Sequence, residues 1–393
     1  MVPGRLLTAA VLATFASACT IGAAADTIPS AGPHSSSSPT PAPVQLKIAL
    51  LEDLAPDEAV AEVLPALHAA EIALANASNA GDLGASIELV PVDTAADPTS
   101  ATAQIVDDPS FVGAIIAPFF RDQATIASAL DRAGVATLSL SSRGTHVSTL
   151  GLERWRRLVA PRPFEASAFA TLVDAMPKSH NGVCLLDGAG SDRSAWPSLV
   201  RSALAAPIPL EMPAPDPSDD PASAVTRVAE AGCGVVIWSG SAEAAAAFRA
   251  AMVEQGLRRV TLAGSDQLKQ DAYLVDAGPA ADRTLATCSC VDLSTSTRLA
   301  AQRFIQDYQS EEGVSPGPYA AEAWDGAWMF VHAIKSAGTL DRAAIGSALF
   351  SASTYEGLAG PYGFLPDGEL ADAPAHIHSY RVEGGRWITL GTR

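Results

Sequence analysis

The residues best suited to binding chemistry are polar side chains in loops that follow short apolar runs. Glu52 follows the run 46–51, and Asp266 comes shortly after the run 260–263. Other loops of this kind contribute Arg121, Ser141, Ser142, Ser191, Asp192 and Ser239. Guanidinium and hydroxyl groups can bind a carboxylate, whereas a carboxylate can bind a cation. These residue types therefore suit a small polar ligand.

No arrangement of residues in the sequence indicates catalysis. The loop 188–190 begins like a dinucleotide-binding motif, but Arg193 occupies the third glycine position. The segment 239–241 lacks the glycines of a nucleophile elbow. His376 and His378 would share one face of a predicted strand, but no acid or cysteine lies at metal-ligand spacing from them. We therefore predict no enzyme activity, no cofactor and no metal.

The composition argues against two classes of partner. Of the 393 residues, 43 are Asp or Glu and 25 are Lys or Arg, which gives a formal net charge of −18. Apart from the segment 154–157 there is no basic cluster, so we expect no nucleic-acid interface. The same balance argues against adsorption to an anionic membrane surface. With 48% hydrophobic residues, the chain can instead bury a large core.

The N-terminus is typical of an exported protein. Residues 1–19 contain an arginine, a short apolar segment and the small-residue site Ala16-Ser17-Ala18-Cys19. The apolar segment is too short to span a bilayer as a mature helix. Residues 20–45 are rich in Ser and Pro and predict an extended tether. A cysteine at the end of such a site can be lipidated, so we expect Cys19 to anchor the mature protein to a membrane. The alternative is an ordinary secretory signal with an incidental cysteine.

The folded part alternates short apolar runs with amphipathic stretches. Helical patterns, such as residues 57–79, separate most of these runs. The pattern restarts near residue 183, which predicts two doubly wound α/β lobes with parallel sheets. The expected strands are 46–51, 86–92, 112–116, 136–140, 183–186, 208–211, 234–238, 260–263 and 285–288, with terminal strands in 376–390.

Several phrases resemble one family of binding proteins. These are LKIALLEDLAPDEA, IELVPVDTAADPTSATAQIVDDPSFVGAIIAP, VVIWSGSAEAAAAFRAAMVEQGL, GPYAAEAWDGAWMFVHAIKSAG and YEGLAGPYGFLPDGEL. Over residues 46–390 the chain resembles the leucine/isoleucine/valine-binding branch of the type 1 periplasmic binding proteins, which are substrate-binding subunits of ABC importers. The last two phrases are the most specific part of this resemblance. Cys19 likewise resembles the acylated cysteine of a bacterial lipobox, although Ala16 replaces the usual leucine.

The resemblance implies a ligand cleft between the lobes, at the carboxyl ends of the parallel strands. We expect residues 46–158 and 294–350 to form lobe 1. Residues 159–293 and 351–393 are expected to form lobe 2. Helices and strands after residue 294 can belong to either lobe, so the chain can cross between the lobes several times. The sequence does not fix where it crosses.

The resemblance also suggests roles for individual residues. Asp266 lies where the family often places an acid for the ligand ammonium. Arg121 replaces the serine of the carboxylate-binding loop, and Ser141-Ser142 replaces an Ala-Thr pair. Ser191 and Asp192 lie in a loop that usually carries an aromatic residue. Arg121 and the hydroxyls suit a carboxylate and Asp266 a cation, unless Arg121 pairs with Asp122 or Glu52 and faces solvent.

Two functions of different classes follow. The first is a monomeric, lipid-anchored extracytoplasmic protein that captures an amino acid, amide or small carboxylate for an ABC permease. The second is a lipoprotein of the same fold that acts as a sensor or regulates an envelope enzyme. An open polar cleft favours the first, and a cleft filled by Phe119, Phe120 and Trp196 favours the second. The sequence does not identify the ligand.

The four cysteines other than Cys19 all lie in the part of the chain expected to form lobe 2. Cys184, Cys233, Cys288 and Cys290 are in or beside predicted strands, and an exported chain permits disulfides. A bridge between Cys288 and Cys290 would be strained, so we expect one bridge that involves Cys233. The spacing alone does not fix its partner.

Overall fold

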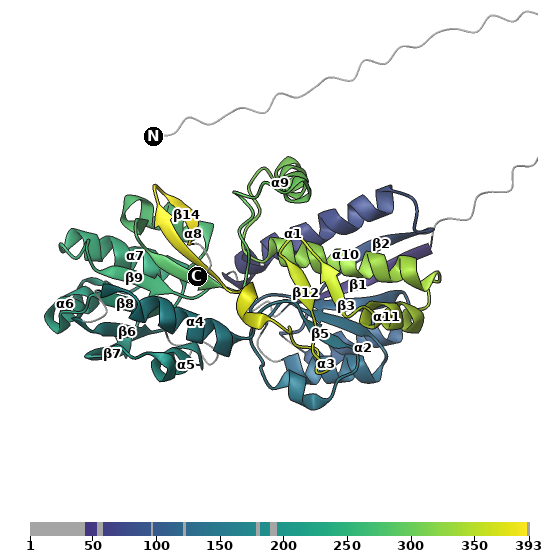
Figure 1. Ribbon diagram of the computed structural model, residues 1–393, viewed down its shortest axis with the longest axis horizontal. Coiled ribbons are helices and arrows are strands. Elements are labelled where there is room, and N and C mark those ends of the chain that lie inside the picture. Colours follow the sequence, from purple (N-terminus) through teal and green to yellow (C-terminus); the bar gives the residue numbers. More distant parts are fainter. Residues whose placement is uncertain are drawn as a thin grey trace, which may run out of the picture. The chain divides into compact units, whose positions relative to one another are not determined.

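The computed structural model describes residues 44–52, 58–95, 97–120, 123–177, 181–188 and 195–390, with only the backbone for helix residues 58–62 (Figure 1). The predicted signal, Cys19 and nearly all of the tether lie outside these ranges, as do Arg121, Ser191 and Asp192. Within the described ranges, no helix combines the length and the apolar character that a membrane span requires.

The first lobe is built on a five-stranded sheet in which every neighbouring pair is parallel. Side chains alternate between its faces: Ile48 and Leu50 pack with α1 and α10, whereas Ala49 and Leu51 pack with α2 and α3. Figure 1 shows these helix pairs on opposite sides of the sheet. The strand order is β2 (Ala85–Asp93), β1 (Val44–Glu52), β3 (Phe111–Ile116), β4 (Ala136–Ser139) and β5 (Trp155–Arg157). The helices are α1 (Glu58–Asn79), α2 (Pro98–Asp107), α3 (Gln123–Arg132) and α10 (Ala320–Ala337).

The second lobe has a seven-stranded sheet with a parallel centre and an antiparallel C-terminal hairpin. Val235 and Ile237 pack toward α4 and α5, whereas Val236 and Trp238 pack toward α6, α7 and α8. The strand order is β14 (Arg386–Leu390), β13 (His378–Glu383), β10 (Leu285–Cys288), β9 (Thr261–Gly264), β8 (Val235–Ser239), β6 (Val183–Asp187) and β7 (Leu210–Pro213). The helices are α4 (Arg162–Asp174), α5 (Ala195–Ala203), α6 (Ala222–Ala231), α7 (Ala242–Glu254) and α8 (Asp271–Ala277). Two doubly wound lobes are therefore confirmed.

The chain returns to the first lobe after β10. α9 (Leu299–Glu312) and α10 contact α1, and α11 (Arg342–Ser351) contacts β3 and α10. The hairpin of β11 (Thr354–Glu356) and β12 (Pro361–Gly363) follows. These contacts agree with a first lobe that includes residues from the last third of the chain.

The segment after α11 differs from the prediction that residues 351–393 all belong to lobe 2. Phe364 packs on the Arg156 guanidinium at 4.6 Å, and Glu369 pairs with Arg157 at 2.9 Å. Both arginines are on β5, so this segment packs against the first sheet. Only β13 and β14 join the second sheet, because their apolar faces complete its core. The other lobe boundaries remain predictions.

The structure confirms one of the expectations for the cysteines and corrects the other. Cys184 on β6 is bonded to Cys233, which confirms a bridge that involves Cys233. Cys288 and Cys290 are also bonded to each other, with their Cα atoms 5.0 Å apart, so the expectation of a single bridge is wrong. The sequence argument failed because the chain turns out of β10 directly after Cys288, which brings two cysteines at this spacing together.

The core of the first lobe is packed without space at Gly113 on β3. A Cβ atom there would lie 2.1 Å from Cε1 of the buried Phe330 on α10. We therefore expect Gly113→Ala to lower the free energy of unfolding by about 1–3 kcal/mol in urea denaturation, because the helix must move away from the sheet. Gly346→Ala in α11 is the matched control, since its Cβ would meet only the Cβ of Ala136 at 3.6 Å. Equal stability of the two variants would contradict this packing.

Candidate functional site

The predicted loop residues that the structure describes all lie at carboxyl ends of strands. Glu52 ends β1, Ser141 and Ser142 follow β4, Ser239 ends β8, and Asp266 follows β9. All five are buried, with at most 4% of their surface exposed. These positions follow from the parallel sheets, whose carboxyl-terminal loops share one edge in each lobe.

Asp266 is bonded to both lobes. Its carboxylate accepts a hydrogen bond of 2.6 Å from the Tyr319 hydroxyl at the start of α10, and one of 2.9 Å from the backbone N–H of Gln267. The guanidinium of Arg162, on the first turn of α4, lies 3.7 Å from the same carboxylate. A group predicted to bind a ligand cation is thus already compensated within the protein.

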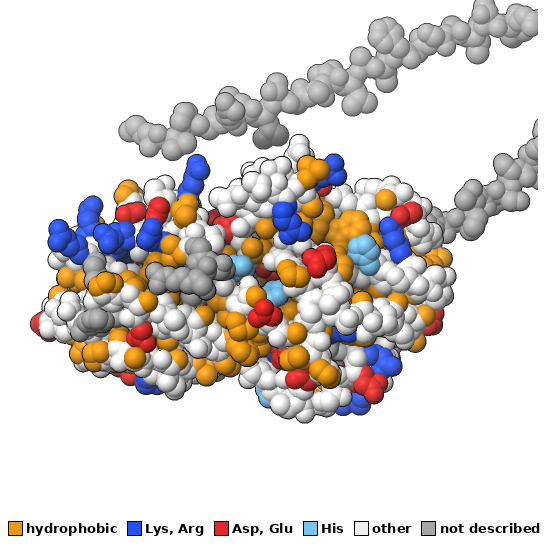
Figure 2. Space-filling view, viewed as in Figure 1, with side chains coloured by type: hydrophobic (Ala, Val, Ile, Leu, Met, Phe, Trp, Pro, Cys, Tyr) orange, Lys and Arg blue, Asp and Glu red, His pale blue; other side chains and the backbone are white. Residues whose placement is uncertain are grey.

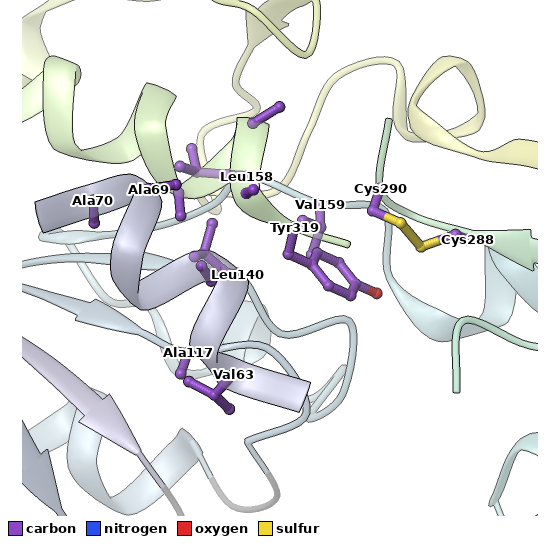
Figure 3. Packing of buried hydrophobic residues seen from close by; sticks show 14 of the residues in the cluster. Val63, Ala69, Ala70, Ala117, Leu140, Leu158, Val159, Cys288, Cys290 and Tyr319 are labelled. Carbon is purple, nitrogen blue, oxygen red and sulfur yellow. A yellow bond between two sulfur atoms is a disulfide. The ribbon is translucent and has the colours of Figure 1, made fainter. Parts of the chain in front are cut away.

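Tyr319 has an unusual backbone for its position. Its φ of 64° is in the left-handed region, and so is that of Phe119, whose ring meets the Tyr319 ring edge-on at 5.5 Å. Non-glycine residues adopt this conformation at a cost, and such residues cluster at functional sites. Figure 3 shows the Tyr319 ring beside Val159, with its hydroxyl turned toward the side of the Cys288–Cys290 disulfide.

The first turn of α4 adds two charged residues that the sequence interpretation missed. The Arg162 backbone N–H donates to the Ser142 carbonyl at 2.9 Å, while the buried Nε and Nη2 of its side chain have no hydrogen-bond partner among the residues described by the structure. Glu165 is completely buried, and its Oε1 accepts hydrogen bonds from the Asp266 backbone and the Thr287 hydroxyl. Burial, reinforced by Asp266, raises the pKa of Glu165. We call Arg162, Glu165, Asp266 and Tyr319 the junction cluster.

Arg157 fixes the backbone of the loop that carries Ser141 and Ser142. Its fully buried guanidinium donates to the carbonyls of Ser141, Arg143 and Gly144 and pairs with Glu369. The Ser141 hydroxyl donates in turn to the Phe120 carbonyl at 3.0 Å. In the sequence, Arg157 stands out only as part of the basic segment 154–157. Its place beside the apolar run 158–160 is the signal that could have indicated this role.

Glu52 and Ser239 lie at other strand ends and make different contacts. The Glu52 carbonyl accepts hydrogen bonds from Thr94, and its side chain lies beside Asp93 of β2. Its Oε1 has no hydrogen-bond partner within the described ranges. Burial, reinforced by the charge of Asp93, raises the pKa of Glu52 to about 7. The Ser239 carbonyl accepts the backbone N–H of Gly188. The described contacts of these two residues stay within their own lobes.

The junction cluster offers groups that can bind a polar ligand. It combines a guanidinium whose Nε and Nη2 have no hydrogen-bond partner among the described residues, a carboxyl with a raised pKa and a compensated carboxylate. Two aromatic residues that were candidates for filling the cleft lie elsewhere: Phe120 is in the core of the first lobe, and Trp196 packs on Phe169 in the second. Among the described residues, no group of three or more His, Cys, Asp or Glu side chains is arranged to hold a metal ion.

Two further buried carboxylates lie on α10 beside this cluster. Glu322 Oε1 accepts the backbone N–H of Val291 at 2.7 Å. Asp325 accepts the backbone N–H of Leu358 at 2.7 Å and the Tyr362 hydroxyl at 2.9 Å. α10 thereby fixes both the segment after β10 and the hairpin after α11. Burial raises the pKa of Glu322 to about 8 and that of Asp325 to about 6.

Comparison with known proteins identifies a family and a fold. Residues 45–385 match the model of a family described as periplasmic binding protein, whereas no curated protein matches the sequence. The Streptococcus pneumoniae branched-chain amino acid transporter substrate-binding protein LivJ, in complex with isoleucine, is similar with a TM-score of 0.72 and 17% identity, over 88% of this chain and 100% of that one.

Two other solved structures are similar over the same share of this chain. The Thermotoga maritima leucine-binding protein LivK has a TM-score of 0.70 and 17% identity, with 88% of this chain and 98% of that chain covered. A Rhodopseudomonas palustris solute-binding protein of an ABC transporter, in complex with 3,4-dihydroxybenzoic acid, has a TM-score of 0.65 and 18% identity, with 88% and 96% covered. These structures confirm the predicted fold class.

The raised pKa of Glu322 predicts how stability depends on pH. Between its ordinary value of 4.5 and about 8, the folded chain keeps a proton that the unfolded chain has released. The free energy of unfolding must therefore fall as pH rises through this window. We expect Glu322→Gln to reduce this fall by on the order of 2 kcal/mol between pH 5 and pH 8 in urea denaturation. Glu230→Gln, at an exposed position of α6, should leave the slope unchanged. Parallel slopes for Glu322→Gln and the wild type would contradict the argument.

Proposed function

Because the chain belongs to the periplasmic binding protein family, we propose that it is a lipid-anchored extracytoplasmic solute-binding protein that captures a small polar ligand for an ABC permease. The single observation that carries the proposal is the junction cluster, in which Asp266 of the second lobe is bonded to Tyr319 of the first. A ligand held there would contact both lobes. The proposed role is therefore binding, not catalysis.

The free groups of the cluster favour a ligand with a carboxylate. The buried Nε and Nη2 of Arg162 have no hydrogen-bond partner in the described part of the chain, and a carboxylate can accept from two N–H groups of one guanidinium. The Oε2 of Glu165 also has no partner there, and with its raised pKa the protonated group can donate to a ligand oxygen. Arg162 thus takes the role that the sequence suggested for Arg121, which remains the competing hypothesis.

Asp266 favours an ammonium group at the other end of the ligand. Its carboxylate is the acceptor for Tyr319, and an ammonium group can replace that hydroxyl as donor. Because Arg162 and Asp266 are buried, the lobes must separate before a ligand enters, as in hinge closure. An amino acid, an amide or a small carboxylate fits these requirements.

The same hydrogen bond favours a second candidate function. Asp266 is compensated by Tyr319 and Arg162 without a ligand, so the two lobes can stay joined with no solute bound. A lipoprotein that uses this fold as a sensor, or to regulate an envelope enzyme, would behave in this way. Such a protein would bind none of the solutes in the screen below.

A ligand screen with two arginine variants tests the binding site. We expect an amino acid or small carboxylate to raise the thermal unfolding temperature of the chain from residue 20 onward, because a ligand of the folded state stabilises it. By calorimetry, Arg162→Gln should lower the affinity for this ligand roughly tenfold or more, equivalent to about 1.4 kcal/mol of binding free energy. Arg227→Gln on α6 is the control at an exposed position.

Each other result has a defined meaning. If Arg121→Ala weakens the ligand and Arg162→Gln does not, the carboxylate binds in the first-lobe loop and our assignment of Arg162 is wrong. A neutral sugar as the sole binder would remove the charge argument altogether.

A separate experiment tests the anchor. We expect the wild-type protein to remain with the membrane fraction through a diacylated Cys19, because two acyl chains on one residue can anchor a protein stably without a membrane-spanning segment. Cys19→Ser should release the protein to the soluble fraction in cell fractionation. Ser17→Thr is a control that keeps the cysteine. If the Cys19 variant and the wild type partition alike, the proposed lipid anchor is wrong.

A further inference from the structure

A cavity of about 720 Å³ lies beside the junction cluster and shares no lining residue with it. Its walls come from α1 and the end of α9 in the first lobe, α7 and the start of α8 in the second, and the connection between α9 and α10. We call it the side cavity. Cavities of this size accommodate small organic molecules.

The side cavity has a negative wall. Glu243, Asp271, Asp276 and Glu312 line it, and none of its described lining residues is Lys or Arg. His68 is the one lining residue that can carry a positive charge, and its Nδ1 already lies 2.8 Å from Glu312. Figure 2 shows Lys and Arg side chains of the second lobe gathered at its outer end, where Figure 1 labels α6 and α7. A cation is therefore the favoured charge type for a ligand in this cavity.

A second observation points to a ligand independently of the carboxylates. Gln270, directly before α8, lines the side cavity with only 9% of its surface exposed. Its Nε2 is buried and has no hydrogen-bond partner among the residues that the structure describes. A buried donor without an acceptor costs roughly 1–3 kcal/mol. A rotation of the side chain that turns this amide to an oxygen atom of a ligand in the cavity would remove this cost.

The rest of the lining is mostly apolar, with Ser241, Ser315 and Tyr308 as its polar members. Leu64 and Pro65 of α1 and Val314 and Pro318 in the connection before α10 contribute apolar surface. A Cβ atom at Gly317 would lie 2.7 Å from Pro65, so α1 and this connection are in close contact. Such apolar surface suits a short hydrocarbon chain.

From these features we propose that the side cavity is a second small-molecule site, for an organic cation with an ammonium group, a short hydrocarbon body and an oxygen acceptor. The ammonium group pairs with Asp271 and Glu312, and the oxygen accepts from Gln270. Because Glu312 is in the first lobe and Asp271 in the second, the bound cation favours the arrangement in which the two lobes are close. This site does not rest on the proposed function of the junction cluster.

Three probes with the same five-carbon chain test the chemistry by calorimetry on the chain from residue 20 onward. 5-Amino-1-pentanol carries the ammonium group and the oxygen, 1,5-pentanediol lacks the charge, and n-pentylamine lacks the oxygen. We expect saturable millimolar binding of the amino alcohol, at least fivefold weaker binding of the amine, and no saturable binding of the diol. Raising the ionic strength should lower the affinity of the protein for the amino alcohol. Failure of the amino alcohol to saturate, or equal affinity for the diol, would overturn the proposal.

Variants locate the binding site. Glu312→Gln and Asp271→Asn should each lower the affinity for the amino alcohol about fivefold. This factor corresponds to the upper end of the energies of exposed ion pairs. Glu311→Gln is the matched control, because this neighbouring carboxylate is on the same helix and does not line the cavity. Equal weakening by Glu311→Gln would mean that the cation responds only to net charge, which contradicts the site. None of these variants should change the affinity of a ligand of the junction cluster, so failure of either proposal is distinguishable from failure of the other.

Discussion

The hydrogen bond from Tyr319 to Asp266 is the interaction on which the junction of the two lobes depends. Asp266 is fully buried, and a buried carboxylate without partners is strongly destabilising. Its compensation comes from α10, through Tyr319, and from α4, through Arg162. The first-lobe helix must therefore stay close to the loop after β9. Charges that require partners fix this contact, and the strained backbone of Tyr319 is one cost of satisfying them.

The sheets could be predicted from the sequence because their signals are local. Alternation of apolar runs with helical periodicity located most strands, and the restart near residue 183 divided the chain into two lobes. The position of Asp266 also followed, because a loop after a parallel strand has a defined place in such a fold. The bridge between Cys288 and Cys290 was not predicted, although the two residues are close in sequence, because their spacing does not reveal how the chain turns after β10.

The partners of these residues could not be predicted, because they are distant in sequence. Asp266 is separated from Tyr319 by 53 positions and from Glu165 by 101, and Arg157 from Glu369 by 212. Periodicity carries no information on pairs of this kind. Glu165 resembles any acidic residue in the first turn of a helix until β9 and β10 bring Asp266 and Thr287 against it. The same long range explains why the segment with Glu369 was assigned to the wrong lobe.

The order of the segments along the chain has a consequence for how the protein is made. The first sheet ends at residue 157, yet its cover includes α10 and α11, which end at residue 351. The second sheet is completed only by β13 and β14, which end at residue 390. A nascent chain on the ribosome therefore exposes an uncovered face of the first sheet until residue 351 has been made, and an unfinished second sheet until residue 390 has been made. Neither lobe can complete its core before these late segments are available, so the order of synthesis delays the completion of both lobes.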